Sequence, residues 1–302
     1  MDERVCVIVN PVAGRGRAAR MIPEISARFA EIGVSDIRTT AHKGDEAGSA
    51  RQAIADGFTT LVAVGGDGTT SNVANAILHS GSDARLAVMS AGTGNDFAKV
   101  LGTERASAET IARLCVEPAG SRVDVGRIED VFFVNCCGFG FDVAVLEEIR
   151  RTRWLRGSSV YLYTAVRQIF GFAGIEVEVR SEESHRPAQL HMLLVIANSA
   201  NFGGMFRIAP NASVTDGCLD AVSILFLPPA RRIAMLVAAT MGAHESQPGC
   251  VMERSRSFEL KFEAAPTYET DGELHRARTA SLDVISCPLA LRVVTGPART
   301  LS

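Results

Sequence analysis

Two glycine-rich turns, each holding one aspartate, constrain the fold of this chain more than any other feature. Gly65-Gly66-Asp67-Gly68-Thr69 follows the apolar run at 61–64, and Gly92-Thr93-Gly94-Asn95-Asp96 follows the run at 86–89. Apolar strands that lead through glycines into helices are typical of parallel α/β sheets, which present backbone N–H groups to phosphate. An aspartate in such a turn would repel phosphate unless a cation or a donor lies between them. The pair of turns therefore indicates a nucleotide site with a divalent metal.

Length and composition bound the class of protein. The chain has 302 residues, enough for two domains, and is 47% hydrophobic and 22% charged, as expected of a folded protein. A net charge of −3 gives no general attraction to nucleic acid, so no such partner is expected. The seven cysteines are scattered without a CxxC pair, which favours a reduced, cytoplasmic setting. The longest apolar stretches fall short of the roughly 18–20 residues of a membrane span, so any membrane contact should be peripheral.

The pattern of elements changes near residue 123. Before it, strands at 5–9, 37–40, 61–64 and 86–89 alternate with helices. After it, strands such as 131–137, 175–179 and 258–262 dominate, several with the period-2 alternation of antiparallel sheets, and helices are expected at 159–170 and 229–242. The sequence thus predicts an α/β nucleotide-binding domain with a parallel sheet over 1–124 and a β-rich, antiparallel, sandwich-like domain over 125–289. Residues from about 290 to 302 could return to the first domain.

Several further motifs accompany the two turns in a fixed order along the chain. They include Asn10-Pro11-x-Ala13-Gly14, Val123-Asp124-Val125-Gly126, Gly138-Phe139-Gly140-Phe141-Asp142, Thr215-Asp216-Gly217-Cys218 and Thr270-Asp271-Gly272-Glu273. The ordered set resembles the diacylglycerol-kinase catalytic family, which includes soluble bacterial lipid kinases and the sphingosine and ceramide kinases. The resemblance covers nearly the whole chain. It implies that the first domain binds ATP, that the β-rich domain covers the lipid side, and that the active site lies in the interdomain cleft.

The resemblance also implies roles for individual residues. The nucleotide site would be lined by Asn10, Gly14, Thr40, Gly65, Gly66, Asp67, Gly68, Thr69, Gly92, Thr93, Gly94 and Asn95. Asp67, Asp96 and Asp216 would form an aspartate–water–magnesium network. Asp271 would be the general base, with Glu273 beside it in the metal network. A structural Mg²⁺ could lie in the loop at 213–219, held mainly by backbone carbonyls between Ser213 and Cys218.

Simpler roles remain open for the same residues. Aspartates in glycine turns often bond to backbone, and Asp271-Gly272 is a strong hairpin signal. Arg15, Arg17 and Arg20 could hold ATP phosphates, Arg15 being the best candidate, or form the solvated face of a helix. One departure concerns Ser71-Asn72, which stands where the family usually has Asn-Glu and one residue more. It removes one carboxylate next to the nucleotide or metal.

Contacts outside the catalytic machinery are less specific. The basic stretch at 150–156 contains Trp154 and suits an anionic membrane surface, or it is a solvated loop with the tryptophan packed inside. A sheet edge of the second domain could pair two copies into a homodimer.

These observations predict an ATP- and Mg²⁺-dependent lipid kinase, most simply one that converts diacylglycerol to phosphatidic acid. The alternatives are a kinase of the same superfamily that acts on sphingosine, ceramide, phosphatidylglycerol, NAD or a sugar phosphate, and a nucleotide-binding protein without turnover. A hydride-transfer enzyme is disfavoured, because aspartates inside the glycine turns would crowd a pyrophosphate.

Overall fold

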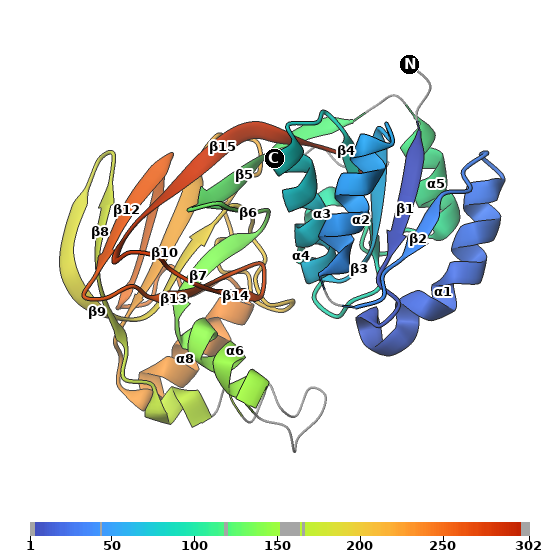
Figure 1. The fold of residues 1–302 in the computed structure, drawn as a ribbon. Helices are drawn as coiled ribbons and strands as arrows, with labels where there is room; N and C mark the ends of the chain where they lie inside the picture. The colour runs from blue at the N-terminus through green and yellow to red at the C-terminus, as the bar shows by residue number, and fades with distance from the viewer. Residues whose placement is uncertain (1–3, 43, 118–119, 152–163, 165–166, 297–302) are drawn as a thin grey trace. The chain divides into compact units, whose positions relative to one another are not determined.

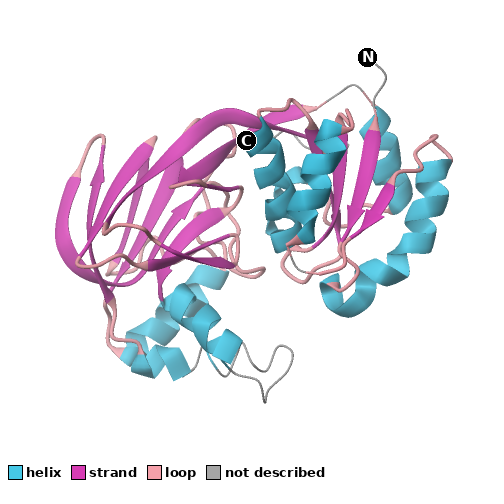
Figure 2. Cartoon of the chain, in the orientation of Figure 1, coloured by secondary structure: helices cyan, strands magenta, loops and turns pink. Residues whose placement is uncertain are grey.

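The computed structural model describes residues 4–42, 44–117, 120–151, 164 and 167–296. The chain divides into two compact units, and only the described residues of each unit are discussed below. Unit 1 comprises Met1–Val125, Ser213–Asp216 and Cys287–Ser302, and unit 2 comprises Gly126–Ala212 and Gly217–Ser286. Figure 1 shows the order of the elements along the chain, and Figure 2 shows that strands dominate unit 2.

Unit 1 is built on a parallel sheet, as predicted. Its order is β2, β1, β3, β4 and the end of β15. The bounds are β1 Val5–Val9, β2 Ile37–Thr39, β3 Thr60–Gly65, β4 Arg85–Ser90 and β15 Ser281–Val293. Every residue of β1, β3 and β4 is buried, which explains why these strands appear in the sequence as continuous apolar runs.

Helices cover both faces of this sheet (Figure 1). They are α1 Ala13–Ala30, α2 Asp45–Ala55, α3 Asp67–Ser80, α4 Asp96–Leu101 and α5 Ala108–Val116. Phe29 of α1 and Ile111 of α5 share one apolar cluster with Val7 of β1. Ser107 caps the start of α5, because its side chain accepts a hydrogen bond from Thr110 N–H at 3.1 Å.

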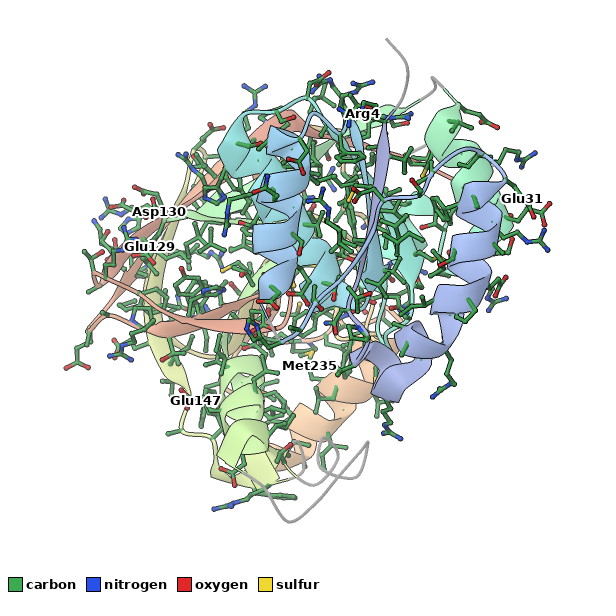
Figure 3. All side chains as sticks on the ribbon, turned by 45° about the vertical axis from the view of Figure 1, so that its right-hand side comes forward. Arg4, Glu31, Glu129, Asp130, Glu147 and Met235 are labelled. Carbon is green, nitrogen blue, oxygen red and sulfur yellow. The ribbon has the colours of Figure 1, made fainter. Side chains whose placement is uncertain are left out.

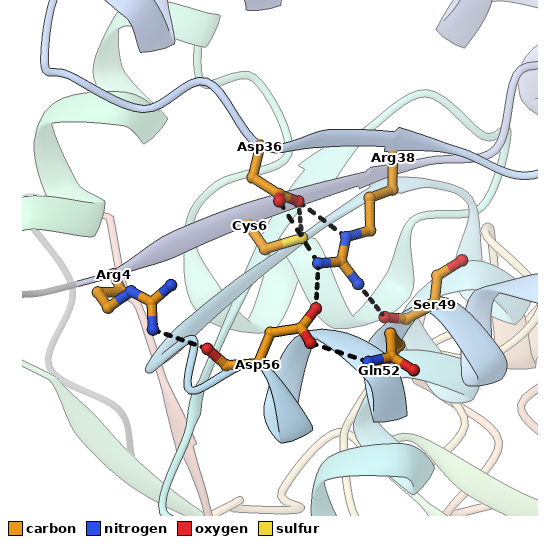
Figure 4. A network of polar contacts seen from close by, with 7 residues as sticks. All are labelled: Arg4, Cys6, Asp36, Arg38, Ser49, Gln52 and Asp56. Carbon is orange, nitrogen blue, oxygen red and sulfur yellow. Dashed lines mark hydrogen bonds and ion pairs between the residues drawn. The ribbon is translucent and has the colours of Figure 1, made fainter.

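A polar network ties β1, β2 and α2 together (Figure 4). Arg38 donates from Nε to Asp36 at 2.8 Å and from Nη2 to Asp56 at 2.7 Å. The hydrogen bonds from Arg38 lower the pKa of both aspartates. Burial, followed by the hydrogen bond to Asp36, raises the pKa of the Cys6 thiol. Cys6 is therefore a structural, unreactive thiol.

Unit 2 is an antiparallel arrangement, again as predicted. Along its sheet the order is β14, β13, β7, β9, β8, β12 and the start of β15, and β10 pairs with both β9 and β11. The bounds are β6 Val131–Phe133, β7 Cys136–Gly140, β8 Ile175–Ser181, β9 His185–Ala197, β10 Leu219–Leu225, β11 Cys250–Ser255, β12 Ser257–Phe262, β13 Thr267–Thr270 and β14 Glu273–Arg276. Strand β5 (Ser121–Ile128) begins in unit 1 and ends in unit 2.

Alternate side chains of the central strands pack into two separate apolar cores. In β9, Leu194 and Ile196 join one core, whereas Leu193 and Val195 join the other. Helices α6 (Phe141–Arg151) and α8 (Pro229–Thr240) carry side chains into the second core. Unit 2 is thus a sandwich-like β domain with helices over one layer.

One predicted strand is wrong in its bounds. Residues 131–137 form two strands, β6 and β7, instead of one. The break falls at Val134 and Asn135, whose N–H groups donate to the carboxylate of Asp271. A side chain distant in the sequence therefore interrupts the strand.

Two predicted features lie mostly outside the described residues. These are the helix at 159–170 and the basic stretch at 150–156 around Trp154. Within the described part of the chain, no helix combines the length and apolar character needed to cross a membrane.

Candidate active site

The two glycine turns lie against each other at the ends of β3 and β4. The carbonyl of Gly65 accepts hydrogen bonds from the N–H groups of Ala91 (2.7 Å) and Gly92 (3.0 Å). A Cβ on Gly92 would lie only 2.5 Å from Cα of Gly66. Residue 92 must therefore be glycine for the turns to pack, and this packing brings the starts of α3 and α4 together.

Asp67 joins the two turns through its side chain. Its Oδ2 accepts the N–H of Asn95 at 2.8 Å and its Oδ1 accepts the N–H of Asp96 at 2.7 Å. Asn95 has a left-handed φ of 52° and closes its own turn by accepting the N–H of Gly92 at 3.1 Å. Burial, followed by the charge of Asp96, raises the pKa of Asp67. Asp67 thus bonds to backbone of its own turn, as turn chemistry suggests, and also to two backbone N–H groups of the other turn.

Glu46 is a functional candidate that the sequence analysis did not single out. It is buried in the first turn of α2 and accepts Nδ2–H of Asn10 at 2.8 Å and the N–H of Gly44 at 2.9 Å. Asn72 also donates to Glu46, at 3.3 Å. Asn10 in turn donates to Oγ1 of Thr69 at 3.1 Å. The family's carboxylate is missing next to Asn72 in the sequence, but Glu46 of α2 places a carboxylate beside Asn72 in the structure.

The segment after β1 forms a tight left-handed loop. Gly14, Arg15 and Gly16 have φ angles of 56°, 57° and 80°, so regular helix begins only after them. A Cβ on Gly14 would lie 1.9 Å from the carbonyl oxygen of Ala91, at the second glycine turn. Arg15 adopts a strained, left-handed backbone conformation in this loop. Such strain is found most often at functional sites. The side chains of Arg15, Arg17 and Arg20 are all exposed.

Asp271 occupies a hairpin turn and is buried as well. It connects β13 to β14, and the positive φ angles of Asp271 (49°) and Gly272 (87°) fit a two-residue hairpin of type I′. Its Oδ1 accepts the N–H groups of Asn135 (2.9 Å) and Cys136 (3.2 Å), and its Oδ2 accepts that of Val134 (3.0 Å). Three backbone N–H groups thus hold the carboxylate in place. The hairpin interpretation is correct and is compatible with a chemical role.

Two further buried acids lie next to this hairpin. A Cβ on Gly138 would meet Oδ2 of Asp142 at 1.8 Å and Oε1 of Glu269 at 2.8 Å, so both oxygens face the same point. Glu269 accepts the N–H of Gly272 at 2.6 Å. Burial raises the pKa of Asp142 to about 7, and burial together with Asp142 raises that of Glu269 well above its usual range. Burial of the pair thus favours the neutral form of these carboxyl groups.

The predicted metal ligands are spread over several elements. Ser213 and Asp216 belong to a segment of unit 1, where the carbonyl of Val214 accepts the N–H of Asp124 at 2.7 Å. Cys218 is partly buried at the start of the next segment, and Glu273 begins β14. Thr40, predicted for the nucleotide site, is buried and donates to the carbonyl of Val9 at 3.4 Å.

The described residues include no group of three or more His, Cys, Asp or Glu side chains placed to hold a metal. Mg²⁺ often binds through one or two carboxylates, waters and substrate phosphates. In this structure both carboxylate oxygens of Asp67 accept backbone N–H groups, and the buried Asp96 pairs with Lys99 at 2.8 Å. The full six-residue metal set stays a prediction.

Comparison with known proteins agrees with this architecture. Residues 4–128 match the family model described as diacylglycerol kinase catalytic domain, and residues 135–295 match the YegS C-terminal NAD kinase beta sandwich-like domain. A protein of Pseudomonas aeruginosa (strain UCBPP-PA14) named "Probable lipid kinase YegS-like" is 30% identical over 85% of this chain and 83% of its own. A protein of Mycobacterium tuberculosis (strain ATCC 25618 / H37Rv) named "Diacylglycerol kinase" is 25% identical, over 96% and 94%.

Comparison with solved structures agrees with these sequence matches. The crystal structure of a diacylglycerol kinase from Bacillus anthracis str. Sterne covers 99% of this chain and 99% of its own, with a TM-score of 0.73 at 20% identity. Both family models, the relative at 30% identity and the fold thus agree with the motifs. This chain belongs to the diacylglycerol kinase and YegS-like lipid kinase family, and it is a kinase whose acceptor is an alcohol group.

Proposed function

We propose that this protein transfers the γ-phosphoryl group of ATP to a lipid hydroxyl, most simply that of diacylglycerol, to give phosphatidic acid. The observation that carries the proposal is the joining of the two glycine turns through Asp67. It gathers backbone N–H groups from two strand–helix turns at one edge of a parallel sheet, in a chain of a lipid kinase family. Phosphoryl transfer needs mainly positioning and neutralisation of charge, and such an edge supplies both.

In the proposed reaction, unit 1 binds ATP and unit 2 supplies the general base. Unit 1 holds ATP on its glycine turns, with Asn10 and Thr69 positioned by Glu46. Mg²⁺ bound near Asp67 and Asp96 would neutralise phosphate charge. The lipid hydroxyl oxygen bonds to the γ-phosphorus as the bond to the β–γ bridging oxygen breaks, and Asp271 takes the hydroxyl proton.

Several predictions remain part of this proposal. They are the roles of Asp216 and Glu273, the interdomain cleft, the cytoplasmic location and the homodimer. The choice of diacylglycerol follows the names of the relatives, one of which is "Diacylglycerol kinase".

The test is an acceptor screen with γ-labelled ATP and Mg²⁺. Mixed micelles would carry diacylglycerol, monoacylglycerol, phosphatidylglycerol, sphingosine or ceramide, and parallel samples without micelles would contain NAD or a sugar phosphate. Label in diacylglycerol supports the proposal, and label in another lipid corrects the acceptor. Label in a soluble acceptor alone would overturn the lipid-kinase assignment.

A further inference from the structure

The outward side of α8 is apolar, which is unusual for a helix on the surface of a protein. Ile233, Val237 and Met241 are 46%, 55% and 68% exposed. They follow one another at intervals of four residues, so they form one stripe, called here the α8 stripe. Ala230 and Ala234 are exposed on the same side, and the sequence holds no Asp, Glu, Lys or Arg from 233 to 244.

The inward side of α8 is apolar too and fixes the helix in place. Met235 and Ala239 belong to the second core of unit 2; Figure 3 labels Met235 on this helix. Buried Arg232 donates to the carbonyls of Leu227 (2.6 Å) and Ile169 (2.8 Å) and stacks over the Phe226 ring at 4.3 Å. The α8 stripe is therefore an exposed apolar surface on a helix that is fixed to the core. Contiguous exposed apolar surface of this kind marks sites of contact with a partner or a membrane.

Neighbouring side chains extend this surface and add positive charge. Met205 is 61% exposed in the turn closed by the Phe202–Phe206 bridge. That turn is tied to α8, because the N–H of Arg207 donates to the carbonyl of Ala239 at 3.0 Å. Arg207 and Arg231 are both exposed, one at each end of the helix.

We propose that the α8 stripe, together with Met205, docks this kinase on an anionic lipid bilayer. The apolar side chains would enter the boundary between headgroups and acyl chains, while Arg207 and Arg231 would contact anionic headgroups. This inference rests on the proposed function, since a lipid acceptor resides in a bilayer.

The charge beside the stripe argues for an anionic bilayer as the partner. Arg207 and Arg231 are exposed near the two ends of the helix, and the sequence holds no Asp or Glu from 233 to 244. A layer of anionic headgroups complements these cations. Affinity for a bilayer also grows with each apolar group inserted, so the four exposed apolar side chains each contribute.

The experiment measures sedimentation with phosphatidylcholine vesicles, with and without phosphatidylserine, in the absence of ATP. The variant Ile233→Gln/Val237→Gln/Met241→Gln keeps good helix formers in α8. The control is Val116→Gln, which alters an exposed valine at the end of another helix. The α8 variant should bind at least about tenfold more weakly to both vesicles, and the control should bind like the wild type. Arg207→Gln and Arg231→Gln should each lose about fivefold, only with phosphatidylserine.

Further readouts separate the possible failures. Val237→Trp should bind vesicles more tightly, so the inference does not depend on a loss that misfolding could cause. Transfer to a water-dispersed short-chain diacylglycerol should be the same in wild type and α8 variant. Equal sedimentation of wild type and α8 variant would overturn the inference, as would a dimer that the variant converts to monomer. Vesicle binding through α8 without any lipid phosphorylation would instead contradict the proposed function alone.

Discussion

The backbone N–H of Asp96 donates to Oδ1 of Asp67 at 2.7 Å and so joins two turns that are 29 residues apart in the sequence. The same carboxylate accepts the N–H of Asn95 through its other oxygen. Asp67 therefore holds together the edge of the sheet at which we propose that ATP binds.

Replacing Asp67 by Asn should weaken both stability and ATP binding. The amide retains one acceptor oxygen, but its NH₂ group would face the N–H of Asn95 or Asp96. The free energy of unfolding should fall by about 1–3 kcal/mol. Thermal unfolding and calorimetric ATP titration would measure the two effects. The control Asp130→Asn alters an exposed aspartate paired with Arg278 and should change neither. Wild-type melting and ATP affinity in Asp67→Asn would contradict the assigned role.

Replacing Gly92 by Ala should force the glycine turns apart. The new Cβ would lie 2.5 Å from Cα of Gly66, and overpacking of this kind costs about 1–3 kcal/mol. ATP affinity should fall at the same time. Gly48→Ala is the matched control, because a Cβ there meets nothing within 4 Å on α2 and should stabilise the helix by about 0.5–1 kcal/mol. Urea denaturation would compare them, and equal stability of Gly92→Ala and wild type would refute the packing argument.

Replacing Glu46 by Gln should disturb the loop that carries Asn10. Gln would retain one acceptor, but its NH₂ group would face the donors on Asn10 or Gly44. We expect a loss of about 1–3 kcal/mol in unfolding free energy and a higher KM for ATP. Glu24→Gln on the exposed side of α1 is the control. An unchanged KM in a destabilised variant would restrict Glu46 to a purely structural role.

Much of the fold was predictable because its signals are local. Continuous apolar runs predicted β1, β3 and β4. The Asp271-Gly272 pair predicted the hairpin, since this dipeptide suits the left-handed turn. Each of these features depends on residues within a few positions of one another.

The remaining features depend on contacts between distant residues. Asp67 can bond to the second turn because β3 and β4 are neighbours in the sheet. The break in the strand at 134–135 is caused by Asp271. In the sequence, Glu46 resembles an ordinary acidic residue in the first turn of a helix, where the helix dipole favours negative charge. Asp142 belonged to a recognised motif but had no assigned role, and Glu269 sits two residues before Asp271. No local pattern indicates that these acids are buried.

The burial of Asp142 predicts an unusual pH dependence. Its pKa is raised from 3.8 to about 7, so between these values the folded state holds a proton that the unfolded state releases. The contribution of this group to stability is therefore present at low pH and lost as pH rises through 7. Asp142→Asn mimics the protonated form and should melt at least about 2 °C higher than wild type at pH 8, with a smaller difference at pH 5. A variant that melts below wild type at pH 8 would contradict this assignment.

The central claim is that this chain phosphorylates a lipid hydroxyl with Asp271 as the base. The most direct measurement is the initial rate of transfer from γ-labelled ATP to diacylglycerol for wild type and Asp271→Asn, with ATP affinity and melting temperature measured on the same samples. We predict labelled phosphatidic acid from the wild type and a rate at least about 100-fold lower in the variant, with ATP affinity unchanged. A folded variant that retains the wild-type rate would contradict the account.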